Sequence, residues 1–542
     1  MNARTRHPLL LAIAMAAMVA LLPDLAVGQS PSPLAMASPP ATQPAASGTL
    51  TVGLSAEAES LDPYLTYQNS GISVVNAIFD TLVSITRDGT IGTGGLAESW
   101  SFPTDTTLEL KLRPGITFQD GSPFTADDVA FSIDRVKSAA LASQLASNYA
   151  SVTSAEAVDA LTVRLHLSQP DASLIANLGT LAIVSRTYHD KVGDAGYATH
   201  PVGTGPFSFV EWVKDDHLTL TANPAYWSGS WKGWPLVQTV TFRPIPDAGT
   251  RLSELTTGGI DVMADLPADQ ISLLSGTGAS PVYLEDGHHV EIWLNTGGVG
   301  AGAIGSVAKD PTPDQKVALE ALAKPAVRSA LNMAIDRGTI IETLLQGYGK
   351  PMTNVFGAGT SATDASVPEF AYDPAAARQM LADAGYPNGF SVDMDVCTCD
   401  RTDTLEAVVA QLADIGVNVT IKPFEVGQFN DDWGAGRSDP MRASRLGFPN
   451  DQGFYLSFWV HSGGVLSAYA NPQVDTLIDQ QAITMDATAR AALLGHIASL
   501  THADPPAIFL WSAGSLYGKR DDVAWQPHVI GYIPAFGTSV SR

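Results

Sequence analysis

Alternating hydrophobic and polar residues mark the stretch from residue 96 to residue 135 as one supersecondary unit. In LELKLR, which begins at Leu108, leucines alternate with charged residues, and this two-residue period is that of a strand with one buried and one wet face. The turn dipeptides PG and DG then bracket the residues 116–118. Dipeptides of this kind reverse the chain, so the pattern predicts a hairpin after the strand.

The hydrophobic period changes at Thr125. This threonine stands three residues before Asp128, which is the spacing of a capping box. Val129, Ile133 and Val136 then recur on one face at helical spacing. The sequence therefore predicts a helix that begins near Thr125.

Strand and helix patterns also alternate in the second half of the chain. A strand pattern at 390–396, a helical pattern at 405–415 and a strand pattern at 417–421 follow one another directly. This order is typical of a parallel sheet with helices packed on it, so we expect an α/β fold. Just before them, Asp373 as a cap and Pro374 at the first helical position predict another helix.

The wording AESW…KLRPGITFQDGSPFTADDVAFS, from Ala97 onward, resembles the family 5 extracellular solute-binding proteins, which are the oligopeptide, dipeptide and nickel receptors of bacterial ABC importers. PVGTGPFSFVEW at 201–212 and NPAYW at 223–227 are similar to the same family. The resemblance runs from about Thr49 to the C-terminus and is weakest at 428–464. It implies an α/β, two-lobed periplasmic binding protein fold with an extra subdomain in the first lobe and a ligand cleft between the lobes.

The resemblance and the patterns together predict the domain organisation. We expect a signal peptide at 1–28, a disordered linker at 29–48, lobe I at 49–295 with a small subdomain at about 96–200, lobe II at 296–506, and a return to lobe I at 507–542. The apolar runs at 290–295 and 507–511 are the expected crossings between the lobes.

The N-terminus carries the pattern of an exported protein. Arg4 and Arg6 precede an apolar run at 9–22 that is too short to span a bilayer, and small residues follow around Ala26. A buried N-terminal helix is a weaker interpretation because no polar face interrupts the run. No cysteine follows the leader to carry a lipid, so we expect a soluble periplasmic protein without a lipid anchor.

Length and net charge limit which kinds of partner the protein can bind. The 542 residues exceed what one hydrophobic core serves, so several subdomains are expected. The formal net charge of -25 repels nucleic acid and anionic membranes, and it favours a monomer. The expected partners are a small-molecule or short-peptide ligand and the permease subunits of an ABC importer.

The compact signatures of common enzymes are missing from the sequence. No GxSxG, HExxH or GxxxxGK[ST] motif occurs. The glycines at 300–305 match the GxGxxG pattern of dinucleotide-binding proteins. However, Lys309 and Pro311 follow where that motif requires a helix, so a glycine loop is the better interpretation. We predict no catalytic residue and no cofactor; the alternative is a secreted hydrolase whose site residues are scattered along the chain.

Two pairs of residues invite a metal-site hypothesis. His288 and His289 are adjacent, and neighbouring strand residues point to opposite faces, so they do not easily share one ion. Cys397 and Cys399 lie on one side of an extended chain but lack a third ligand nearby. We predict no metal, and the sequence leaves open whether the two cysteines are thiols, bridged or metal-bound.

The segment from Trp433 to Trp459 mixes arginines with aromatics, and loops of this kind carry recognition. In the resembled peptide receptors this region supplies an acidic residue for the ligand's amino terminus, and here Asp451 is the nearest acid. Arg442 and Arg445 suit a carboxylate or phosphonate because guanidinium groups bind such oxygens in pairs. The alternative is that these arginines pair with surface acids.

The predicted ligand-binding residues stack on the ligand, hydrogen-bond to it or pair with its charge. They are Tyr64, Tyr67, Asn69, Asn295, Arg442, Arg445, Asp451, Trp459 and Trp511. The expected function is capture of a peptide-like or other small organic solute, anionic or zwitterionic, and its delivery to a permease. Docking of the loaded protein to a chemoreceptor is a further hypothesis that the sequence does not separate from transport.

Overall fold

The computed structural model describes residues 43–296, 311–356, 367–398, 401–425, 428–429, 432, 437–446, 451–464 and 466–542. The predicted signal peptide, most of the predicted linker, the glycine loop at 300–305 and Cys399 lie outside the described residues. At the end of the predicted linker, the Ser47 amide donates to the Leu236 carbonyl at 3.0 Å.

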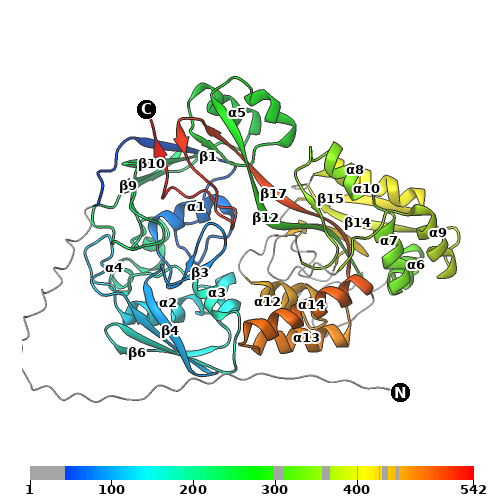
Figure 1. Cartoon of the computed structure of the whole chain (residues 1–542), viewed down its shortest axis with the longest axis horizontal. Coiled ribbons are helices and arrows are strands. Elements are labelled where there is room, and N and C mark those ends of the chain that lie inside the picture. The colour runs from blue at the N-terminus through cyan, green and yellow to red at the C-terminus, as the bar shows by residue number, and fades with distance from the viewer. Residues whose placement is uncertain are drawn as a thin grey trace, which may run out of the picture. The chain divides into compact units, whose positions relative to one another are not determined.

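One large sheet organises the described chain (Figure 1). Its strand order is β15-β14-β16-β12-β17-β11-β1-β10-β9-β8, and β13 pairs with β17. The bounds are β1 (Thr49–Leu54), β8 (Phe207–Val213), β9 (His217–Ala222), β10 (Thr239–Pro244), β11 (Val262–Met263), β12 (Ala279–Leu294), β13 (Lys350–Pro351), β14 (Phe390–Cys397), β15 (Val417–Phe424), β16 (Met441–Leu446) and β17 (Ala507–Arg520). Strands from both halves of the chain therefore belong to one hydrogen-bonded sheet.

The two longest strands join the halves of this sheet. β12 and β17 are antiparallel, with pairing that begins at Ala279 opposite Arg520 and ends at Trp293 opposite Ala507. The apolar runs predicted as crossings are only the ends of these strands, which continue through polar residues. The lobe boundaries themselves stay a prediction.

A second sheet has four strands in the order β4-β5-β7-β6. It lies within the residues predicted to form the small subdomain, whose bounds stay a prediction. Its strands are β4 (Ala97–Thr104), β5 (Thr107–Leu112), β6 (Val152–Asp159) and β7 (Thr162–Leu167), and the helix α2 (Ala126–Val136) accompanies them. Leu108, Leu110 and Leu112 are buried, as their alternation predicted. The capping box also forms, because the Asp128 carboxylate accepts the Thr125 amide at 2.9 Å.

The strand-helix-strand prediction is confirmed in the second half of the chain. β14 and β15 pair in parallel from Phe390 opposite Val417, and α10 (Thr402–Asp414) connects them. The helix α9 (Pro374–Asp383) begins after Asp373, whose carboxylate accepts the Ala376 amide. This unit is the α/β arrangement that the sequence indicated.

The remaining described elements are further helices and four short strands, which form two separate two-stranded sheets. The other helices are α1 (Asn69–Ile78), α3 (Leu174–Leu178), α4 (Arg186–Tyr197), α5 (Ala248–Thr257), α6 (Pro313–Leu322), α7 (Pro325–Met333), α8 (Arg337–Thr343), α12 (Gln452–Tyr455), α13 (Pro472–Ile483) and α14 (Ala487–Ala503). The other strands are β2 (Ser84–Ile85), β3 (Ile91–Gly92), β18 (Val523–Ala524) and β19 (Ser539–Val540). One core cluster includes α7, α9 and α10, and a separate one packs α13 and α14 against β12 and β17.

Candidate functional site

The larger cavity, called pocket 1 here, has a volume of about 680 Å³. Most of its wall comes from the turn after β1, from helix α1 and from the 144–148 and 177–182 segments. The C-terminal segment 528–532, Lys232 and two residues from the other half of the chain, His288 and Asp451, also contribute to the wall. Amide, hydroxyl and carboxylate groups thus meet aromatic rings around one space, which suits a small polar organic molecule.

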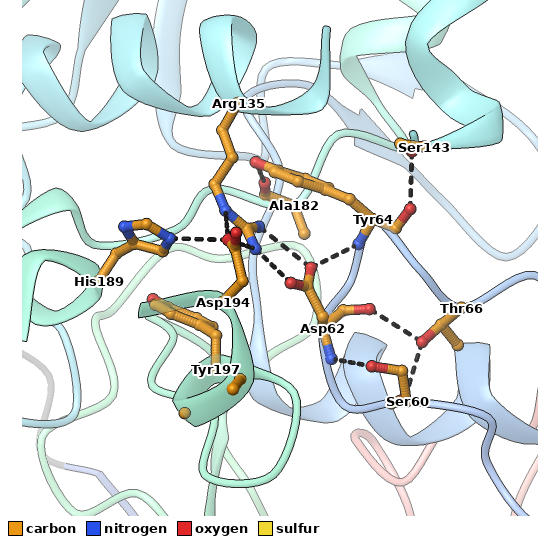
Figure 2. Close-up of polar contacts among 12 residues, drawn as sticks. Ser60, Asp62, Tyr64, Thr66, Arg135, Ser143, Ala182, His189, Asp194 and Tyr197 are labelled. Atoms are coloured by element: carbon orange, nitrogen blue, oxygen red, sulfur yellow. Dashed lines mark hydrogen bonds and ion pairs between the residues drawn. The ribbon is translucent and has the colours of Figure 1, made fainter. Parts of the chain in front are cut away.

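A buried ion pair fixes the turn after β1 that carries this wall. Asp62 has no exposed surface, and Arg135 of α2 donates to both of its carboxylate oxygens (Figure 2). Asp62 also accepts the Tyr64 amide at 3.0 Å. On the other side Arg135 pairs with Asp194, which lies 2.8 Å from the His189 ring. These contacts tie the turn to α2 and α4.

Tyr64 and Tyr67 have different places in this turn. The Tyr64 ring is fully buried, and its hydroxyl donates to the Ala182 carbonyl at 2.8 Å (Figure 2). Its backbone carbonyl accepts the hydroxyls of Ser143 and Tyr67. Tyr67 lines pocket 1 and Tyr64 does not, so Tyr64 lies behind the wall and supports Tyr67. The exposed Asn69 also lines pocket 1.

Lys232 contributes a buried charge to pocket 1 that the sequence analysis missed. Its ammonium group lies 3.1 Å from the Asp80 carboxylate and donates to the carbonyls of Asn76 and Phe79. Burial lowers the pKa of Lys232 despite the attraction of Asp80. Because these partners already hold the ammonium, its main effect is to fix the end of α1.

The C-terminal segment supplies a stacked aromatic pair to the same wall. The ring of His528 stacks on Tyr532 at a centroid distance of 4.4 Å. Burial lowers the pKa of His528 to about 4, so the ring is neutral at pH 7. Its Nε2 donates to the Ile85 carbonyl at 2.9 Å. Neither residue carried a sequence signal, because more than 400 residues separate them from Ile85, and no local pattern encodes such a contact.

Asp451 brings a carboxylate to pocket 1 from the second half of the chain. It caps α12 by accepting the Gly453 amide at 2.7 Å. Arg490 of α14 donates to both carboxylate oxygens at 2.6 Å. The acid that the sequence placed near a ligand amino group is therefore already paired inside the protein.

A second cavity, called pocket 2 here, has a volume of about 470 Å³. Apolar side chains such as Leu345, Leu405 and Trp511 form much of its wall. Two guanidinium groups, from Arg401 and Arg445, also line it. Arg401 pairs with Asp403 at 2.5 Å, whereas the exposed guanidinium of Arg445 makes no hydrogen bond or ion pair with any described residue.

Arg442 and Arg445 lie on strand β16 and not on a loop as the sequence analysis expected. Residues an odd number apart on a strand point to opposite faces, so the two arginines separate. Arg442 is buried, lies 3.5 Å from the centre of the Phe429 ring and donates to the Phe429 carbonyl. Arg445 is the one that reaches a cavity.

The last predicted ligand-binding residues lie in neither cavity wall. Trp459 is buried and packs on Trp293 at a centroid distance of 5.6 Å. Asn295 is also buried, and its backbone N–H donates to the Pro440 carbonyl at 2.9 Å. The wall of pocket 1 thus includes Tyr67, Asn69 and Asp451 from the predicted set, and the wall of pocket 2 includes Arg445 and Trp511.

The cysteines and histidines fit no metal site in the described part of the chain. Cys397 is disulfide-bonded. Among the described residues, no group of three metal-ligating side chains comes together. His289 is buried, and burial lowers its pKa to about 3, whereas His288 lines pocket 1.

Comparison with known proteins now decides the family. The model for "Bacterial extracellular solute-binding proteins, family 5 Middle" matches residues 93–467. The chain belongs to this family. The glutathione-binding protein GsiB of Pectobacterium atrosepticum is 30% identical over 83% of this chain and 86% of its own length.

Solved structures agree with the fold of this family. The periplasmic binding protein DppA from Helicobacter pylori, solved with the peptide STSA, is 25% identical, with a TM-score of 0.74 over 92% of this chain and 98% of its own. CtaP from Listeria monocytogenes is 20% identical and shares the fold, with a TM-score of 0.78 over 92% of this chain and 100% of its own. The predicted fold class is confirmed.

The family 5 protein is therefore the periplasmic solute-binding component of an ABC importer and not an enzyme. None of the described helices is both long and apolar enough to cross a membrane. The hydrolase alternative is excluded by the family.

Proposed function

We propose that this family 5 protein captures a peptide-like, anionic or zwitterionic organic solute in a cleft between two lobes and delivers it to the permease subunits of its importer. The proposal includes export through cleavage of the signal peptide at 1–28, no lipid anchor, and action as a monomer. Closure follows from contacts that the ligand makes with both lobes, because only a difference in affinity between open and closed states drives the motion.

The position of Arg445 is the observation that supports an anionic or zwitterionic ligand. Its exposed guanidinium lines a cavity with largely apolar walls and has no ion-pair partner among the described residues. In a chain with a net charge of -25, an arginine without an internal acid is well placed to bind the carboxylate of a ligand. Pocket 1 supplies the matching polar groups, with Tyr67, Asn69 and the carboxylate of Asp451.

The similar proteins support a peptide-like solute. The name of the Pectobacterium protein states that it binds glutathione, and the Helicobacter protein was solved with a tetrapeptide. Glutathione carries carboxylates and an amine on a short peptide, so it has the chemical groups for which both pockets offer partners. It is the first compound to test.

The experiment has two arms. Protein purified from its own periplasm without denaturation is analysed by native mass spectrometry, and the mass of any released compound identifies the ligand class. Calorimetric titration of glutathione and of short peptides into ligand-free protein then measures affinity. Stoichiometric binding of one carboxylate-bearing compound supports the proposal. A retained ligand without any acidic group, together with no binding of the peptides, contradicts it.

A further inference from the structure

Asp451, in the wall of pocket 1, forms a two-point ion pair with Arg490. The Nη1 of Arg490 donates to Oδ2 of Asp451, and its Nη2 donates to Oδ1, both at 2.6 Å. The side chains are 12% and 14% exposed for Asp451 and Arg490, so water screens the pair weakly. The positive charge of Arg490 therefore cancels the negative charge that Asp451 presents to the cavity.

The surrounding residues hold this pair in place. The side-chain carbonyl of Gln481, which has no exposed surface, accepts from Nε of Arg490 at 3.1 Å and from Nη2 at 2.9 Å. Gly453 permits the close approach, because a Cβ there would lie 2.8 Å from Oδ1 of Asp451 and 3.2 Å from Nη2 of Arg490. Three segments of the chain, at α12, α13 and α14, thus meet at this ion pair.

The hydrogen bonds leave Asp451 little capacity for a ligand. A carboxylate offers about four acceptor positions, and three are taken by Nη1 and Nη2 of Arg490 and by the Gly453 amide. The described residues leave one position, on Oδ2. A ligand group can still donate one hydrogen bond there, but an ammonium gains little Coulomb energy from a pair whose net charge is zero.

We propose that Arg490 is a positioning residue that neutralises Asp451 in the wall of pocket 1, so that the protein accepts a hydrogen-bond donor at the amino end of its ligand without requiring a positive charge. This inference rests on the proposed function, because it assumes that pocket 1 holds the ligand's amino end.

Competition between charged and uncharged amino ends tests the inference. The probe is a mixture of glutathione with dipeptides and tripeptides, each present in equal amounts as the free amine and as the N-acetylated form. Native mass spectrometry measures the ratio of free to acetylated peptide bound. We expect the wild type to hold both forms with a preference below about threefold, because a neutral pair does not select for charge.

Substituting either partner uncovers the charge of the other. Arg490→Gln leaves a negative Asp451 and should shift the ratio towards the free amine by about tenfold or more. Asp451→Asn leaves a positive Arg490 and should shift it towards the acetylated form. Arg490→Lys retains the charge and should keep the ratio near that of the wild type. A purely structural role of Arg490 would lower the binding of both forms and leave the ratio unchanged.

The outcomes separate this inference from the proposed function. An unchanged ratio in Arg490→Gln and in Asp451→Asn overturns the inference while peptide binding persists. A strong preference of the wild type for the free amine also overturns it. Circular dichroism checks that each variant is folded, and if Arg490→Gln does not fold, the direction of the shift in Asp451→Asn decides. If no peptide of either form binds any of the proteins, the proposed function itself is overturned.

Discussion

Arg135 reaches from helix α2 to the turn after β1, where its guanidinium forms a two-point ion pair with the fully buried carboxylate of Asp62. Both side chains are almost inaccessible, with exposures of 4% for Arg135 and 0% for Asp62. Asp62 also accepts the Tyr64 amide, and Tyr64 in turn receives the hydroxyl of Tyr67 on its carbonyl. The pair therefore holds the segment from which Tyr67 lines pocket 1.

Breaking this pair should destabilise the protein strongly. Asp62→Asn leaves the charge of Arg135 largely buried with only the exposed Asp194 as a partner, and removing one member of a buried ion pair costs about 3 to 5 kcal/mol. Urea unfolding measures the free energy of unfolding. The exposed Asp127 on the same helix offers a matched control, Asp127→Asn, which should change it by less than about 0.5 kcal/mol. Equal free energies of unfolding for the two variants would show that the ion pair does not stabilise this turn.

Glu291 should make stability depend on pH. It is fully buried on β12, where its Oε1 accepts the Tyr455 hydroxyl at 3.1 Å, and burial raises its pKa to about 8. The folded protein therefore keeps a proton that the unfolded chain loses near the ordinary value of 4.5. This contribution to stability is complete below pH 4.5 and is lost as the pH rises through 8.

Thermal unfolding from pH 4 to pH 9 tests this sign. Glu291→Gln should be about as stable as the wild type at pH 4 and should lose less stability than the wild type on going to pH 9. The neighbouring His289 has its pKa lowered to about 3 by burial, so its contribution is lost as the pH falls below 6.5. Because both proteins keep His289, their difference isolates Glu291. A constant difference in Tm across the range would contradict the raised pKa.

The N-terminal pattern predicts the mass of the mature protein. Arg4 and Arg6, the apolar run at 9–22 and the small residues around Ala26 indicate cleavage shortly after Ala26. Intact-mass analysis of periplasmic protein should show this shortened chain without acyl mass. A periplasmic chain that still begins at Met1, or one that carries a lipid, would contradict the prediction.

Local patterns predicted the regular elements well, because a two-residue period marks a strand and three- and four-residue spacings mark a helix. The first strand at Thr49–Leu54 and the capped helix after Thr125 appear as expected, and so does the parallel pair that begins at Phe390 and Val417. The length of β12 escaped prediction because its middle is polar and is held by β17, which lies more than 200 residues away. Pairing across such a distance leaves no local period.

The candidate site was harder to predict, since cavity walls combine distant segments. Lys232 and His528 line pocket 1 but are held by carbonyls far along the chain, so no motif marks them. Tyr64 and Tyr67 look equivalent in sequence, yet Tyr64 is buried and its hydroxyl donates to the Ala182 carbonyl. Only the backbone path decides which side chain faces the cavity.

The two arginines of β16 offer the sharpest test of ligand recognition. The guanidinium of Arg445 lines pocket 2 with no partner among the described residues, whereas Arg442 is buried against Phe429. If Arg445 pairs with a ligand carboxylate that is shielded from water, Arg445→Ala should weaken binding by about 2 to 5 kcal/mol. Its stability should stay near that of the wild type because the side chain is exposed.

Arg442→Ala should show the opposite pattern. Loss of its stacking on Phe429 and of its hydrogen bond to the Phe429 carbonyl lowers the free energy of unfolding, while a ligand in pocket 2 keeps its own contacts. Calorimetry with the compound recovered from native protein measures binding, and urea unfolding measures stability. The exposed Arg186 on α4 provides the control Arg186→Ala, which removes the same charge away from both pockets. Equal losses of affinity in Arg445→Ala and Arg186→Ala would show that Arg445 acts only through long-range charge. Stacking on the aromatic walls would then be the main source of binding.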